Sequence, residues 1–79
     1  MKVEVRVFAG LQKYINGVSS GVPFEVELGP EATGMELLNK LDIPKEEAFV
    51  LMVNGCRVEL GSVLKEGDRI GIFPPVGGG

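Results

Sequence analysis

Strict alternation of polar and apolar residues at the start of the chain limits its fold more than any other feature. From Lys2 to Phe8 the sequence reads KVEVRVF, which places Val3, Val5 and Val7 on one face of an extended strand and charged side chains on the other. A strand that is buried on one face needs neighbouring strands and a covering layer. Because 79 residues can enclose only one small core, we expect a single domain built on one sheet.

Two later segments repeat the alternation. In VPFEVEL, over 22–28, the residues expected to face the core are Val22, Phe24, Val26 and Leu28. A last strand runs to Phe73 with Ile70 and Ile72 facing inward, and it follows a turn at 66–68. We therefore interpret the residues that open this strand as turn and edge residues, namely Asp68 and Arg69.

One helix is predicted within the segment GPEATGMELLNKLDIP, over 29–44. Thr33 is a suitable N-cap, and Glu36 follows it three residues later, as in a capping box. Pro44 is expected to end the helix. The buried stripe is expected to comprise Met35, Leu37, Leu38 and Leu41.

The segment FVLMV, over 49–53, is apolar on both faces, which indicates a central strand with something packed on each side. Asn54-Gly55 is a strong hairpin signal, and alternating apolar residues after it predict a short return strand. The order strand, strand, helix, strand, short strand, strand predicts an α+β fold, in which four or five strands wrap around one helix.

Strand parity leaves several large apolar residues on the uncovered side of the sheet. Phe8 and Phe73 should point outward, and Val50 and Met52 join them where the first, third and last predicted strands are neighbours. A patch of aromatic and methionine side chains usually marks a protein contact. The alternative is that the loop over 9–21, part of which could coil, folds back and covers Phe8.

Charge and composition exclude several function classes. The net charge is −3 with the cations scattered along the sequence, so we expect no nucleic-acid or membrane partner and favour a basic or neutral protein partner. Histidine is absent, and we find no phosphate-binding loop and no metal-ligand spacing. The lone Cys56 is interpreted as a half-buried apolar residue. We therefore expect a cytoplasmic protein with no bound cofactor, no metal and no enzymatic activity of its own.

The chain finishes on FPPVGGG, and we divide it into a folded domain over 1–73 and a flexible glycine-rich tail over 74–79. Pro74 and Pro75 favour an extended direction, so this tail could reach at most roughly 20 Å. Its glycines suit a narrow channel because they lack a Cβ. A terminal carboxylate at Gly79 is a poor electrophile until it is activated, for example by ATP. The alternative is a frayed end or a cloning remnant.

Residues 53–79, VNGCRVELGSVLKEGDRIGIFPPVGGG, closely resemble the C-terminal half of the MoaD group of ubiquitin-like sulfur carriers, the small subunit of molybdopterin synthase. Residues 5–14, VRVFAGLQKY, resemble the first strand of that group and the turn after it. The resemblance implies a β-grasp fold and a reactive Gly78-Gly79 pair. It implies that an adenylating enzyme related to ubiquitin activators uses ATP and Mg²⁺ to adenylate Gly79, that sulfur transfer gives a thiocarboxylate, and that the large catalytic subunit receives the loaded tail.

The resemblance also implies roles for neighbouring residues, because Phe8 and Phe73 match positions that are commonly apolar and face the partner. The predicted partner-binding set is Phe8, Val50, Met52, Phe73, Pro74, Pro75, Val76 and Gly77. Gly77 stands where the group often has Ser or Thr, and Gly10 stands where a basic residue is frequent. The third glycine makes the C-terminal ending more similar to that of ThiS, the carrier for thiazole synthesis. Molybdopterin, thiamine thiazole or tungsten cofactor synthesis, conjugation to lysines as a protein modifier, and simple binding are therefore all open.

Overall fold

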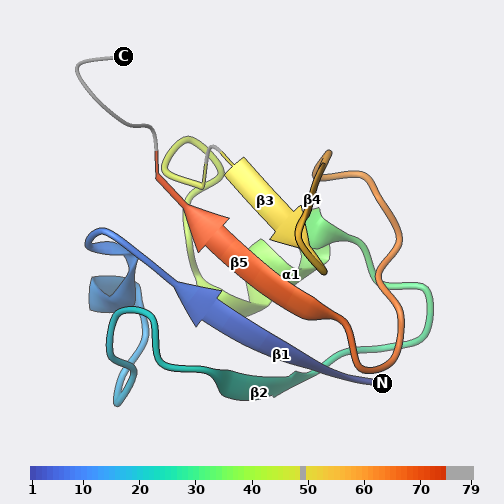
Figure 1. The fold of residues 1–79 in the computed structure, drawn as a ribbon, viewed down its shortest axis with the longest axis horizontal. Coiled ribbons are helices and arrows are strands. Elements are labelled where there is room, and N and C mark those ends of the chain that lie inside the picture. Colours follow the sequence, from blue (N-terminus) through green and yellow to red (C-terminus); the bar gives the residue numbers. More distant parts are fainter. Residues whose placement is uncertain (49, 75–79) are drawn as a thin grey trace.

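The computed structural model describes residues 1–48 and 50–74. Five strands form one mixed sheet in the order β2-β1-β5-β3-β4 (Figure 1). They are β1 (Lys2–Val7), β2 (Phe24–Glu27), β3 (Val50–Val53), β4 (Cys56–Val58) and β5 (Arg69–Phe73). β1 and β5 are parallel, and the other neighbouring pairs are antiparallel. With the helix α1 (Gly34–Leu41) packed across one face, this is the β-grasp fold that was expected.

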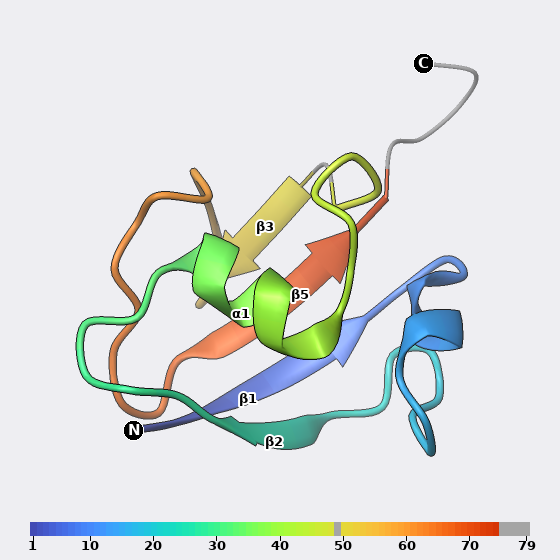
Figure 2. The ribbon, with the colours of Figure 1, turned by 180° about the vertical axis from the view of Figure 1, so that it is seen from behind.

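The core lies between the sheet and α1 (Figure 2). Val3, Val5 and Val7 of β1 are at most 1% exposed, which confirms the inward face that the alternation predicted. Ile70 and Ile72 of β5 lie beside Val5 and Val7 in the parallel register and are equally well buried. The apolar faces of β1 and β5 therefore form one continuous surface against which the helix packs.

The predicted N-cap of α1 is confirmed, but Pro44 is not the residue that ends the helix. The Thr33 hydroxyl oxygen accepts a hydrogen bond from the Glu36 N–H at 3.3 Å, and this bond satisfies one of the free donors of the first turn. The helix ends at Leu41, and Asp42 follows in the left-handed conformation, two residues before Pro44. Proline therefore lies beyond a helix that has already ended.

The buried stripe of α1 differs from the prediction. Leu37 and Leu38 are buried, but Met35 and Leu41 are only half-buried. The fully buried residue of the first turn is Gly34, which lies three and four residues before the two leucines and so shares their face. Met35 lies at the side of this face, and Leu41 lies at its end.

The prediction that Val22 faces the core is wrong. β2 begins only at Phe24, and Val22 is 54% exposed. Gly21 has a φ of 76°, and the Val22 N–H donates to the carbonyl of Ser19 at 3.2 Å, so the chain is still turning at this point. The other three predicted residues contribute to the core, namely Phe24, Val26 and Leu28.

The prediction of a central, doubly covered strand over 49–53 is also wrong. β5 is the middle strand, and β3 lies between it and the edge strand β4. α1 covers one face of β3, and no helix or strand of residues 1–48 and 50–74 covers the other (Figures 1 and 2). Phe49 lies outside the described residues. The hairpin is confirmed, because Asn54 and Gly55 have φ angles of 52° and 86° and link β3 to β4.

In the described part of the chain, neither α1 nor the 3-10 turn over 11–14 has the length and apolarity that crossing a membrane requires. The division between a domain over 1–73 and a tail over 74–79 stays a prediction. Pro74 is described, directly after β5, whereas residues 75–79 lie outside the described residues.

Candidate docking face for a partner protein

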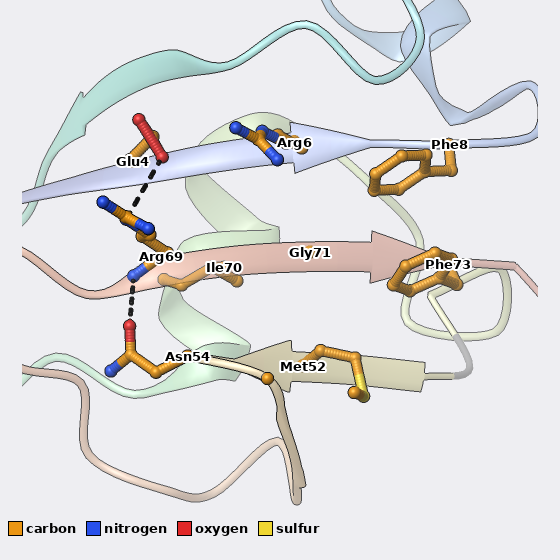
Figure 3. A pocket seen from close by; sticks show the side chains of 10 residues that line it. Glu4, Arg6, Phe8, Met52, Asn54, Arg69, Ile70, Gly71 and Phe73 are labelled. Carbon is orange, nitrogen blue, oxygen red and sulfur yellow. Dashed lines mark hydrogen bonds and ion pairs between the residues drawn. The ribbon is translucent and has the colours of Figure 1, made fainter.

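The side of the sheet turned away from α1 is called the open face, because no helix or strand of the described residues covers it (Figures 1 and 2). Alternation and strand register assign its outward residues: Lys2, Glu4, Arg6, Phe8, Glu25, Glu27, Val50, Met52, Arg57, Arg69, Gly71 and Phe73. Phe8 follows β1 and Phe73 ends β5, and their rings stack with centroids 4.5 Å apart and planes 1° apart (Figure 3). Such a pair contributes about 0.5–1.5 kcal/mol beyond area burial, so the rings form one apolar platform.

The loop after β1 supports Phe8 but does not enclose it. The Gly21 N–H donates to the Val7 carbonyl at 2.8 Å, which brings residue 21 beside the ring. A Cβ added at Gly21 would lie 3.5 Å from Cε1 of Phe8. Phe8 nevertheless stays half-buried and keeps its stack with Phe73. The expectation of an outward Phe8 and the alternative of a covering loop are therefore each partly right.

A notch interrupts the middle of the open face at Gly71. The strand register places Arg6 on one side of Gly71 and Met52 on the other, so a residue without a side chain lies between two long ones. Phe8 and Phe73 line the same hollow (Figure 3). We call this hollow the Gly71 notch. Its volume of about 480 Å³ is enough to receive a side chain from another protein.

A second shallow hollow adjoins the notch and is almost entirely apolar. It is lined by Val50, Met52, Phe73 and Pro74. Five of the predicted partner-binding residues therefore lie on one continuous surface, and their role in binding stays a prediction. The other predicted site residues lie outside the described residues: Pro75, Val76, Gly77, Gly78 and Gly79.

Polar bonds fix the opposite end of the open face. The Asn54 side chain donates to Asp68 Oδ1 at 3.0 Å and accepts from the Arg69 N–H at 3.0 Å. Asp68 Oδ2 also accepts from the Lys65 N–H at 2.8 Å, and Asp68 is only 8% exposed. The prediction of Asp68 as a turn residue did not include this buried role. The prediction of Arg69 as an edge residue is wrong, because Arg69 begins the central strand and lies 3.9 Å from the carboxylate of Glu4.

The single cysteine departs from its prediction. Cys56 is exposed, not half-buried, because it follows the hairpin turn directly on the three-residue edge strand β4. Within residues 1–48 and 50–74 no group of three His, Cys, Asp or Glu side chains could hold a metal ion.

One titratable side chain away from the open face is perturbed. A hydrogen bond to the Glu47 carboxylate, together with slight desolvation and the charge of Glu47, raises the pKa of Tyr14 above its ordinary value. Lys13 lies 4.0 Å from Glu47 and 5.2 Å from the centre of the Tyr14 ring. These contacts hold the 3-10 turn to the loop after α1.

Comparison of the sequence with models of known protein families identifies the family of this chain. The sequence matches the ThiS family model from residue 5 through residue 79, a range that includes Phe8, Phe73 and the glycine-rich end. The chain belongs to the ThiS family. A search among curated proteins gave no match.

Solved structures similar to this ThiS family member support the same placement. A Pyrococcus furiosus protein described as molybdopterin converting factor, subunit 1, is 32% identical with a TM-score of 0.73, and the match covers 96% of this chain and 99% of that chain. A chain from the complex of subunits 1 and 2 of molybdopterin-converting factor from Helicobacter pylori is 25% identical with a TM-score of 0.61, and both chains are fully covered.

Small archaeal modifier protein 1 of Haloferax volcanii has a TM-score of 0.73 at 22% identity, covering 95% of this chain and 98% of that chain. At that identity the likeness shows the fold alone. The expected resemblance to ubiquitin-like sulfur carriers of the ThiS and MoaD type is therefore confirmed at the level of family and fold.

Proposed function

We propose that this ThiS family member is a cytoplasmic sulfur carrier, whose Gly79 is adenylated and converted into a thiocarboxylate that donates sulfur in molybdopterin synthesis. The observation that carries the proposal is that Phe73 belongs both to the open face and to the strand from which residues 74–79 continue. A partner that docks on this face is therefore placed beside the start of the tail. On its own the protein is a cargo subunit, and the catalysis belongs to its partners.

The chemistry required of the tail is simple and balanced. The Gly79 carboxylate attacks the α-phosphorus of ATP and displaces pyrophosphate, with Mg²⁺ and ATP held by the adenylating enzyme. Hydrosulfide then attacks the acyl carbon and AMP leaves, so a thiocarboxylate forms with no change in the oxidation state of carbon. Gly78 presents no side chain next to the reacting carbon, which lets the backbone lie close to a nucleotide.

Delivery of such a tail requires that the body of the protein bind as well. Ordering three glycines costs roughly 3–6 kcal/mol of backbone entropy. Burying about 300 Å² of the apolar open face contributes on the order of 7 kcal/mol before the general costs of association. The stacked platform of Phe8 and Phe73 and the hollow beside Val50 and Met52 provide a surface of this kind.

Two structural neighbours favour molybdopterin as the pathway, since both are described as molybdopterin converting factor subunits. The Helicobacter pylori protein is described in complex with subunit 2, which supports a large-subunit partner for this chain. The ThiS family match favours thiazole synthesis as the second candidate. The same activated tail would also serve tungsten cofactor synthesis or conjugation to lysines.

The first test is sulfur loading in vitro. The protein is incubated with ATP, Mg²⁺, sulfide and the adenylating enzyme of the same organism, and its intact mass is measured. We expect the mass change for replacement of one oxygen by sulfur, and no change for a control with one alanine added after Gly79. Equal reaction of the extended control would refute the proposed role of Gly79.

The second test assigns the pathway. Loaded protein is added to the large molybdopterin synthase subunit with its pterin precursor and, separately, to a thiazole synthase. Sulfur transfer to the pterin alone supports the proposal, and transfer to the thiazole alone replaces it with the second candidate. Gly-Gly remnants on lysines of proteins from the native cells would show conjugation.

A further inference from the structure

All three arginines of the chain lie on the open face. They are Arg6, Arg57 and Arg69, and each is exposed at an outward position of β1, β4 or β5. They are far apart in the sequence, which is why the cations look scattered there. Arginine is enriched at protein interfaces whereas lysine is depleted, because the guanidinium group is weakly hydrated and bonds carboxylates in pairs. This placement indicates a binding surface.

Two of the arginines, Arg6 and Arg69, line the Gly71 notch together with Glu4, and Arg57 lies one strand farther out on β4. Arg6 is the direct neighbour of Gly71 on β1, Met52 is its neighbour on β3, and Arg57 lies opposite Met52 on β4. With about 4.8 Å between strands, the backbones of Arg6 and Arg57 are roughly 14 Å apart across the notch. Arg69 precedes Gly71 by two residues on β5 and so points to the same side.

Acidic residues of the open face neutralise this cluster only in part. Glu4 lies 3.9 Å from Arg69, but their side chains are 38% and 81% exposed, and such a pair contributes at most about 1 kcal/mol. Glu25 and Glu27 belong to the edge strand β2, on the far side of β1 from the notch. The surface around the notch is therefore basic, although the whole chain carries a net charge of −3.

An enzyme that receives the tail must cover these arginines. A standard interface buries about 800 Å² on each partner, which is a disc roughly 32 Å across and about a sixth of the 4810 Å² surface of this chain. Arg69 lies only four residues from Phe73 on β5, which is about 13 Å along a strand. Guanidinium groups covered without an acceptor cost several kcal/mol each, so the partner has to supply acceptors.

We infer that the adenylating enzyme docks on the open face through a surface with one apolar side chain in the Gly71 notch and carboxylates opposite Arg6, Arg57 and Arg69. The inference rests on the proposed function and adds the chemistry of the partner. It replaces the expectation of a basic or neutral partner, which came from net charge. Interface energies depend on the charges within the contact more than on the total charge of the chain.

The test uses the adenylating enzyme of the same organism as the probe and measures both its Kd for this protein and the rate of pyrophosphate release. Arg6→Glu and Arg57→Glu should each weaken binding about tenfold or more at low salt. The matched control Lys40→Glu changes the net charge equally on the exposed side of α1 and should stay within about twofold. Glu4→Gln frees Arg69 and should tighten binding a few-fold.

The outcomes separate this inference from the proposed function. If wild-type protein is adenylated but both arginine variants bind like Lys40→Glu, or bind more tightly than wild type, the acidic docking surface is refuted and the carrier function stands. If wild-type protein binds with the expected charge dependence but releases no pyrophosphate, the docking surface is supported and the tail chemistry fails. Thermal melts verify folding, and Arg6→Gln replaces Arg6→Glu if the reversal lowers the melting temperature.

Discussion

Substitution of Gly71 by alanine should separate the stability of the fold from the use of the open face. Gly71 lies in the central strand without a positive φ, so alanine suits its backbone and should gain roughly 0.5–1 kcal/mol there. The new Cβ would lie 3.1 Å from Cε1 of Phe73 and 3.6 Å from Cε2 of Phe8. Phe73 is half-buried at the surface and can move by a few tenths of an ångström. We expect the free energy of unfolding to stay level or to rise by up to about 1 kcal/mol.

The same methyl group makes the Gly71 notch shallower, and we therefore expect weaker binding of the partner. A partner side chain lifted out of the notch loses the burial of about two methylene groups, which is about 1.6 kcal/mol at about 0.8 kcal/mol each. This loss raises the Kd roughly fifteenfold. Stability and affinity are thus expected to change in opposite directions.

The assay compares Gly71→Ala with Gly61→Ala, a control whose added Cβ would meet no atom within 4 Å. Melting temperature is followed by circular dichroism, and the Kd for the adenylating enzyme is measured by calorimetry. The reasoning fails if Gly71→Ala binds as tightly as the control. It also fails if the variant loses as much stability as affinity, because the notch would then be a packing feature of the fold.

Three further predictions concern the body of the protein. In Gly34→Ala the added Cβ would lie 2.5 Å from Cδ2 of the buried Leu51, so the free energy of unfolding should fall by about 1–3 kcal/mol, and an unchanged melting temperature would contradict this. In Asp68→Ala two hydrogen bonds lose their acceptor, so urea denaturation should show a loss of about 2 kcal/mol, and a loss well below that would contradict it. Glu47→Gln should lower the pKa of Tyr14 in an ultraviolet titration of this single tyrosine, and an unchanged pKa would contradict the assigned cause. Because folding raises that pKa, the associated stability is present below the unfolded value of about 10 and is lost as the pH rises past it.

Local signals in the sequence predicted the elements of the fold well. The alternation in β1 gave its buried face because a strand has a period of two, and the Thr33 cap and the Asn54-Gly55 turn each depend on residues within four positions. The sheet order depends on contacts between the two ends of the chain. No local pattern shows that β5 pairs in parallel with β1 and takes the middle position, whereas the apolar run over 49–53 is typical of a central strand.

The candidate site was also predicted only where local patterns determine it. Strand parity identified Phe8 and Phe73 on one face, because both large residues follow buried positions. The Gly71 notch had no signal, since one glycine between two isoleucines reads as an ordinary strand. The arginine cluster had none either, because Arg6 and Arg57 become neighbours of the notch only through the sheet order. Pairing information from related sequences is the kind of signal that finds such features.

The position of β5 has a consequence for folding. This strand pairs with both β1 and β3, so the aromatic platform and the Gly71 notch exist only once both pairings have formed. A chain in which β5 has separated from the sheet therefore loses the proposed docking surface. Central pairing of β5 thus links that surface to the integrity of the whole sheet.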